Sequence, residues 1–300
     1  MTRRRQLWYY PLFQIPLILL IGCVLLALLF SLLNWGRPSV AVVLSLDLSG
    51  STFGNSPLQF NQPQTVMAQQ VLAAKLYIQR NQRHLATPNE VMIHGFGRNV
   101  VFLTPRFETH SDLLLTQLDQ ALNRSDLLAQ VDPTAKNLSG AIAIATQQLQ
   151  QIPNRCREVL LITDGAAPVD AGVVANARQQ RVKINAIVVG DHAPQLAAAT
   201  EATGGQYRSA PVALLEELVG QTFFESFNRN TRWPIFWGGM AIVCFMWLLV
   251  LPLDRWVLQG WLHLPMNRAG QIALLNALFW TVAIPMILWR FPGWPFVQTC

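Results

Sequence analysis

An uncharged apolar segment near the N-terminus constrains this chain more than any other feature of its sequence. Residues 12–33 read LFQIPLILLIGCVLLALLFSLL and contain no charged side chain. A helix of about 20 apolar residues crosses the hydrocarbon core of a bilayer, whereas a cleaved signal peptide has a shorter apolar region and a small-residue cleavage site. We therefore expect residues 12–33 to form a retained transmembrane helix.

Two further segments, residues 234–253 and 272–289, have the same apolar character. Only 13% of the chain is charged, against about a quarter in an ordinary soluble domain. Aromatic residues lie at or near the ends of the three segments, where their rings suit the headgroup region. We expect a multi-pass protein of the cell membrane, in contact with membrane lipid. The alternative for 272–289, which contains Asn276 and Pro285, is a buried core helix.

The basic residues predict the orientation of these spans. The cluster Arg3–Arg5 is expected to hold an N-terminus of residues 1–11 in the cytoplasm. The region between the first two spans would then be extracytoplasmic, a short loop at 254–271 would be cytoplasmic, and a tail at 290–300 would be outside. Four arginines do not fit this orientation, because they would flank spans on the outer side: Arg37, Arg229, Arg232 and Arg290. The net charge of +6 includes no other basic cluster, so we expect no nucleic-acid partner.

Residues 39–227 have the composition of a soluble domain. Apolar strands, among them 39–46 and 158–163, alternate with segments of helical periodicity. Residues 90–96 and 99–105 resemble two short strands of a hairpin. The alternation predicts an α/β fold, with a Rossmann-like, doubly wound and mostly parallel sheet covered by helices on both faces.

Oxygen-bearing side chains follow two of the predicted strands. Asp47, Ser49 and Ser51 come just after the first strand, and Asp164 follows the strand EVLLIT. Ligands of such sheets bind at the carboxyl ends of the strands, and this mixture of hard oxygen ligands suits Mg²⁺. The alternative is that Asp47, Ser49 and Ser51 only cap a helix or a turn.

Three short motifs carry a family resemblance: DLSGS at 47–51, NLSGAI at 137–142 and LITDG at 161–165. They resemble the three ligand loops of a von Willebrand factor type A (VWA) domain, over residues 39–227. The resemblance implies a metal-ion-dependent adhesion site that holds Mg²⁺ or Mn²⁺. There the serine hydroxyls bind the metal directly, and the aspartates act largely through water. It also implies a protein partner that offers an acidic side chain to the metal.

The middle loop departs from the family pattern. The family places a threonine two residues before the leucine of NLSGAI, and this chain has Lys136 there. A protonated lysine cannot be a metal ligand. Thr134 would supply the hydroxyl if the loop is longer. Alternatively, Lys136 would replace the metal and pair with Asp47 or Asp164, or it would point into solvent.

The competing function classes are weaker. The sequence contains no nucleophile elbow and no phosphate-binding loop, and Ser49 stands where a haloacid-dehalogenase-type phosphatase needs a second acid. We therefore expect no enzyme, and we interpret His94 as a packed strand residue. A third class is a structural membrane-complex subunit whose VWA domain does not bind metal.

The four cysteines, Cys23, Cys156, Cys244 and Cys300, suggest no disulfide framework.

The order of anchor, domain and C-terminal spans also loosely resembles bacterial membrane proteins of the aerotolerance (Bat-type) group. Members of that group are often linked with MoxR-type AAA+ ATPases. This resemblance implies a scaffold or assembly role at the cell membrane.

Overall fold

The computed structural model describes residues 10–33, 35–54, 59–60, 62, 64–165, 167–190, 192–290 and 294–296. Most of the predicted cytoplasmic N-terminus and of the C-terminal tail therefore lies outside the described residues. The chain divides into two compact units. One is Pro38–Asn228, close to the predicted domain at 39–227, and the other is made of the segments on either side of it.

The domain is built on a six-stranded sheet in the order β3-β2-β1-β4-β5-β6. The strands are β1 (Val40–Asp47), β2 (Glu90–Phe96), β3 (Val100–Phe102), β4 (Cys156–Thr163), β5 (Val182–Val189) and β6 (Tyr207–Ala210). All neighbouring pairs are parallel except β2 and β3, which form an antiparallel hairpin. The predicted mostly parallel sheet and its hairpin are confirmed.

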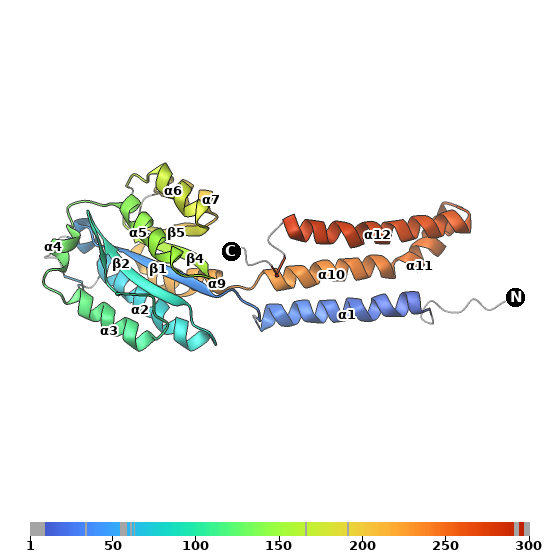
Figure 1. The fold of residues 1–300 in the computed structure, drawn as a ribbon, viewed down its shortest axis with the longest axis horizontal. Helices are drawn as coiled ribbons and strands as arrows, with labels where there is room; N and C mark the ends of the chain where they lie inside the picture. The colour runs from blue at the N-terminus through green and yellow to red at the C-terminus, as the bar shows by residue number, and fades with distance from the viewer. Residues whose placement is uncertain are drawn as a thin grey trace. The chain divides into compact units, whose positions relative to one another are not determined.

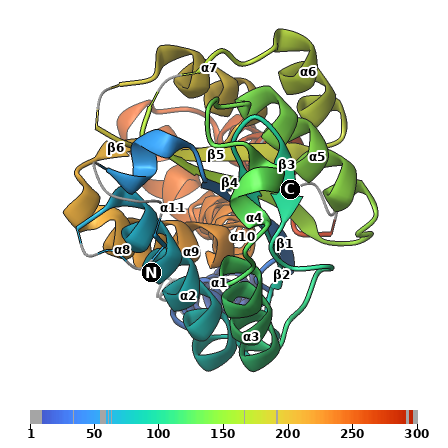
Figure 2. The same ribbon diagram turned by 90° about the vertical axis from the view of Figure 1, so that its left-hand side faces the viewer.

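Helices cover both faces of this sheet, as Figure 2 shows. One face carries α2 (Val66–His84), α3 (Ser111–Leu122), α4 (Leu127–Val131) and the helical run of η3 (Val212–Leu214), α8 (Leu215–Glu217), η4 (Leu218–Phe223) and α9 (Phe224–Asn228). The other face carries α5 (Leu138–Gln150), α6 (Ala171–Gln179) and α7 (Pro194–Thr203).

Strand β1 explains this arrangement. Its even-numbered side chains, such as Leu44, enter the first core, and Ala41 and Val43 enter the second. All eight of its residues are buried. A strand buried on both faces has a nearly continuous apolar sequence, and here the run ends at Asp47. The short 3-10 helix η2 (Gly50–Phe53) follows it.

The second unit contains helices α1 (Pro11–Leu32), α10 (Arg232–Leu248), α11 (Val250–Pro252) and α12 (Met266–Arg290), with the π-helix η5 (Leu253–Trp261). Three helical stretches among the described residues are long and apolar enough to cross a membrane: Pro11–Leu32, Arg232–Trp261 and Met266–Arg290. The loop expected at 254–271 is mostly helical, because η5 continues the second stretch and α12 begins at Met266.

Helix α10 packs against both α1 and α12 (Figure 1). The approach of α10 to α12 is close at Gly239, where an added Cβ would lie 2.9 Å from a Leu288 methyl carbon. Trp247 donates a hydrogen bond from Nε1 to Thr281 Oγ1 at 2.9 Å, which satisfies two polar groups inside the apolar unit. This pairing favours a helical hairpin of α10 and α12 over a single buried core helix.

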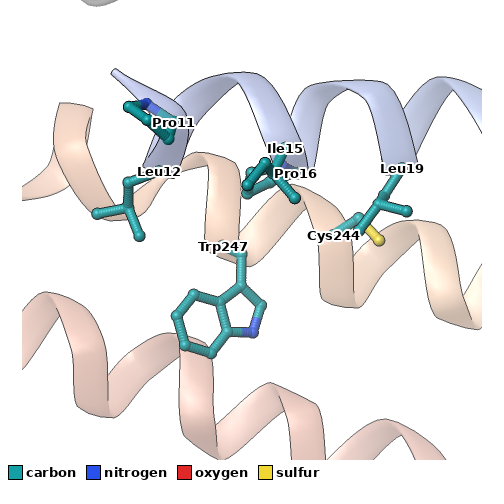
Figure 3. A pocket seen from close by; sticks show the side chains of 7 residues that line it. All are labelled: Pro11, Leu12, Ile15, Pro16, Leu19, Cys244 and Trp247. Carbon is teal, nitrogen blue, oxygen red and sulfur yellow. The ribbon is translucent and has the colours of Figure 1, made fainter.

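An apolar groove of about 460 Å³ runs between α1 and α10 (Figure 3). It is lined by Pro11, Leu12, Ile15, Pro16 and Leu19 of α1 and by Cys244 and Trp247 of α10. The lining offers almost no polar atom to a ligand, so the groove suits contact with hydrocarbon and provides no site for chemistry.

The three described cysteines differ in their bonding state. Cys23 and Cys244 are free thiols, but Cys156, at the start of β4, is disulfide-bonded. Its partner lies outside the described residues. The sequence suggested no disulfide framework, and it gave no signal of this single bond at Cys156. A single pair that is far apart in the sequence has no spacing motif by which it could be recognised.

Candidate functional site

The last residue of β1 anchors the site at the carboxyl edge of the sheet. Asp47 is fully buried, and its backbone N–H donates to Gln70 Oε1 of α2 at 2.9 Å. Its carboxylate accepts hydrogen bonds from the backbone N–H of Ser49 at 2.9 Å and from the hydroxyl of Thr163 at 2.5 Å. These bonds fix the carboxylate between the ends of β1 and β4, so its orientation is set before any ligand binds.

The two serines and the second aspartate lie beside Asp47. Ser49 Oγ is 3.2 Å from Ser51 Oγ, and Ser51 donates from Oγ to Asp164 Oδ1 at 3.1 Å. Ser49 is buried and Ser51 is exposed. The structure therefore brings together all four of the residues that the sequence places after the two strands.

Lys136 enters this group from the loop before α5. Its ammonium forms an ion pair with Asp164 Oδ1 and lies 3.5 Å from Asp47 Oδ2. The lysine side chain is 18% exposed, so it does not point into solvent. We call Asp47, Ser49, Ser51, Asp164 and Lys136 the strand-end site.

Thr134 is held apart from the strand-end site. Its hydroxyl donates to Asp132 Oδ1 at 2.5 Å and accepts from Arg98 Nη2 at 3.0 Å. Arg98 also pairs with Asp132, at 2.8 Å between Nε and Oδ2. These three residues form a rim cluster at the surface, and no bond joins Thr134 to the two aspartates among the described residues.

Backbone contacts fix the loop that carries both Thr134 and Lys136. The turn of the β2–β3 hairpin is bonded to it, because Arg98 N–H donates to Asp132 O at 2.9 Å and Asn137 N–H donates to Gly97 O at 2.8 Å. An added Cβ on Gly97 would lie 2.7 Å from Asp132 O, so this approach requires glycine. The loop then enters α5, where the Asn137 side chain accepts from Gly140 N–H.

Gly165 leaves room for the ammonium. A Cβ at this position would lie 3.2 Å from Lys136 Nζ, closer than ordinary van der Waals contact. The sequence signal TDG, which identified Asp164 as a strand-end aspartate, therefore also explains how the lysine reaches it.

The oxygen ligands and the ammonium of the strand-end site make opposite demands on a divalent cation. Two hydroxyls and two carboxylates would suit Mg²⁺, but an ammonium that has three donors and no acceptor already lies against both carboxylates. The described residues contain no group of three or more His, Cys, Asp and Glu side chains that could hold a metal, at this site or elsewhere. As arranged, with Lys136 in place, the residues do not fit a resident divalent ion.

Sequence reasoning missed Gln70 and Thr163. Thr163 is the residue before Asp164, so the motif contained it without indicating its role. Gln70 lies inside α2 and bonds to Asp47 from 23 residues away, and its position in the helix carries no signal of that contact.

One buried polar pair in the sheet, Ser45 and His94, is structural. Ser45 Oγ and His94 Nε2 are 2.5 Å apart on the adjacent strands β1 and β2, and both residues are fully buried. Burial lowers the pKa of His94 from 6.5 to about 3, so the ring is neutral at physiological pH. The interpretation of His94 as a packed strand residue is confirmed.

Comparisons with known proteins agree with this architecture. Residues 64–209 match the family model of the von Willebrand factor type A domain. No curated protein sequence matches the chain significantly.

Solved structures with a similar fold include a von Willebrand factor type A protein from Catenulispora acidiphila, with 16% identity and a TM-score of 0.47, over 63% of this chain and 43% of that one. The protein BatB from Bacteroides thetaiotaomicron has 15% identity and a TM-score of 0.45, over 63% of this chain and 100% of that one. An aerotolerance-related membrane protein from Bacteroides fragilis has 15% identity and a TM-score of 0.44, over 61% and 98%.

This chain spans less than half the length of the first of these structures, and at such identities the likeness concerns the fold. The family match covers β2 to β6 with the helices between them, and the doubly wound sheet carries the DLSGS and TDG loops at its carboxyl edge. Residues 64–209 therefore belong to a von Willebrand factor type A domain.

Proposed function

We propose that this chain is a membrane-anchored scaffold whose VWA domain binds a protein partner at the carboxyl edge of its sheet. The observation that carries the proposal is the convergence of Asp47, Ser49, Ser51 and Asp164 on one edge, with the Ser51 hydroxyl exposed. Polar groups that hydrogen bonds and an ion pair hold in this way are suited to recognition. We propose binding rather than catalysis.

The three apolar helical stretches support the membrane anchor. We propose that the domain is extracytoplasmic, because Arg3–Arg5 precede the first span. The disulfide at Cys156 supports this side of the membrane, since disulfides persist in oxidising compartments. Reporter fusions after Gln206 and after Gly260 test the topology. The fusion after Gln206 should report the outside and the fusion after Gly260 the cytoplasm, and a cytoplasmic signal after Gln206 would contradict it.

Magnesium or manganese binding at Asp47, Ser49, Ser51 and Asp164 stays a prediction. It requires Lys136 to leave the two carboxylates, and Thr134 would have to leave the rim cluster to become a ligand. A partner that completes the coordination with an acidic side chain belongs to this metal-bound form. The alternative function, a structural membrane-complex subunit with no metal, is favoured by the position of Lys136. A link to a MoxR-type AAA+ ATPase system is proposed from the Bat-type resemblance alone.

A pull-down from detergent extracts tests partner binding at this edge. The bait is the tagged full-length chain, compared with Ser51→Asp, which adds a carboxylate at the exposed hydroxyl. Ser125→Asp is the matched control, because Ser125 is an exposed serine in the turn between α3 and α4. We expect the same partner with the natural chain and with Ser125→Asp, and at least tenfold less with Ser51→Asp. Equal recovery by all three baits would contradict binding at this edge.

A further inference from the structure

We propose that Lys136 supplies the cation of the strand-end site, so that the lysine ammonium takes the place that a divalent metal occupies in a metal-dependent site of this kind. The inference concerns a position at which this chain departs from its family, and it stands on the contacts of the side chain. If the proposed function also holds, partner binding at this edge is independent of metal.

The first argument is the set of contacts. The oxygens that would face a metal already face Nζ, which pairs with Asp164 Oδ1 and lies 3.5 Å from Asp47 Oδ2. The carboxylate of Asp47 has no exposed surface, and that of Asp164 is 11% exposed. Buried carboxylates need a paired charge, and Lys136 provides it.

The second argument is that the lysine and a metal exclude each other. An ammonium cannot donate a lone pair to a metal ion, and its charge repels a cation held by the same two carboxylates. Because Lys136 is mostly buried, solvent screens this repulsion poorly. A divalent ion would therefore have to expel the side chain.

The third argument is that the loop is built to hold the lysine. Backbone bonds from Asn137 to Gly97 and from Arg98 to Asp132 fix the loop on the hairpin, and Gly165 leaves space beside Nζ. The only hydroxyl within this loop, that of Thr134, is used by the rim cluster. The loop therefore presents a cation and withholds a ligand.

A manganese titration of the full-length chain in detergent tests the proposal. The electron paramagnetic resonance signal of free Mn²⁺ measures binding by the natural protein, by Lys136→Thr and by Lys183→Thr. Lys183 is a matched lysine, since its Nζ also lies 3.5 Å from a carboxylate, that of Glu158. We expect Lys136→Thr to bind Mn²⁺ at least tenfold more tightly than the other two proteins, and the added substitution Asp47→Asn to abolish that gain.

Two results of this titration would overturn the proposal. Binding by the natural protein within threefold of Lys136→Thr would mean that the lysine does not compete with the metal. No binding by either protein would mean that something other than Lys136 excludes it.

Amine labelling of the natural protein gives a second measurement that does not depend on a variant folding. The chain has three lysines, and Lys75 and Lys183 are 31% and 33% exposed, against 18% for Lys136. Reductive methylation followed by peptide mass spectrometry should modify Lys136 at least fivefold more slowly than the other two, with or without millimolar Mn²⁺. Faster labelling of Lys136 on adding Mn²⁺ would show that the metal displaces it, and the proposal would be wrong.

The link to the proposed function is tested separately by repeating the pull-down in EDTA. Recovery of the partner in EDTA supports a site that works with its own ammonium, and loss of the partner in EDTA overturns it. Failure to capture any partner would count against the proposed function, while the manganese titration and the labelling still decide the role of Lys136.

Discussion

Replacing Lys136 by methionine should destabilise the VWA domain by leaving two carboxylates without their cation. Asp47 is fully buried and Asp164 nearly so. At the 3.5 Å that separates Nζ from Asp47 Oδ2, two unit charges attract each other by about 5 kcal/mol at an effective dielectric near 20. The second contact, to Asp164, adds to this attraction. Removing one partner of a buried pair typically costs about 3–5 kcal/mol.

Two effects reduce that figure here. Lys136 is 18% exposed, so solvent screens part of the attraction, and methionine preserves most of the apolar stem. We therefore expect Lys136→Met to lower the free energy of unfolding by about 2–4 kcal/mol. Pulse proteolysis of the full-length chain in urea, read from the domain fragment, measures this difference.

Lys183→Met is the matched control. Its Nζ lies at the same 3.5 Å from a carboxylate, but the lysine side chain is 33% exposed, and Asn185 also bonds to Glu158. Burial raises the pKa of Glu158, so this carboxyl takes up a proton more easily than an ordinary glutamate. Removing the ammonium of Lys183 therefore costs less folding free energy. We expect Lys183→Met to cost less than about 1 kcal/mol.

A double-mutant cycle with Asp47→Asn decides whether the cost belongs to the ion pair. Asp47→Asn should destabilise the natural protein but stabilise the Lys136→Met variant, because it then removes an unpaired buried charge. The coupling energy should exceed about 1 kcal/mol. If the two effects add within about 0.5 kcal/mol, Lys136 and Asp47 do not form the pair described here and the reasoning fails.

Three further predictions concern other parts of the chain. Burial lowers the pKa of His94 to about 3, so below pH 6.5 the unfolded chain takes up a proton that the folded chain does not. The free energy of unfolding should therefore fall as the pH drops below 6.5, by up to about 1.4 kcal/mol per pH unit. His94→Gln should remove this one-proton slope from urea unfolding between pH 6.5 and 4.5, and an unchanged slope would exclude His94 as its source. Gly97→Ala should lower the free energy of unfolding by about 1–3 kcal/mol, because the added Cβ would lie 2.7 Å from Asp132 O. If the variant unfolds in urea at the same concentration as the natural chain, that contact is refuted. The free thiols of Cys23 and Cys244 are in hydrogen-bonding contact, so copper-phenanthroline oxidation should join α1 to α10 within one chain; peptide mass spectrometry should find the crosslink, and its absence would contradict the pairing of these helices.

The parts of the fold that depend on local pattern could be predicted from the sequence. A strand such as Val40–Asp47 is buried on both faces, so its apolar run is visible without knowledge of its neighbours. The end of that run also places Asp47 at the sheet edge, and the same logic places Asp164 after β4. Parallel strands bring their carboxyl ends together, which is why these two aspartates were predicted to meet.

The middle loop could not be predicted in this way. Whether Thr134 or Lys136 reaches the strand ends depends on backbone bonds to Gly97 and on the ion pair between Arg98 and Asp132. Gly97 and Arg98 lie more than 30 residues earlier in the sequence than this loop. The sequence left Lys136 either beside the two aspartates or in solvent, and only the packed loop selects the position beside both carboxylates.

The identity of the cation also determines which partner chemistry the edge favours. In the strand-end site, two carboxylates and one ammonium leave a formal charge of −1, from Asp47, Asp164 and Lys136. The rim cluster does not change this net charge, because the charges of Arg98 and Asp132 cancel. A divalent metal that expelled Lys136 would instead bring the site to zero and leave an open position for an acidic side chain. With the lysine in place, an incoming carboxylate meets net negative charge, whereas the exposed Ser51 hydroxyl favours a neutral or basic group. An acidic partner and a lysine-filled site are therefore competing predictions, and a partner that binds in EDTA through a basic or amide side chain would favour the lysine.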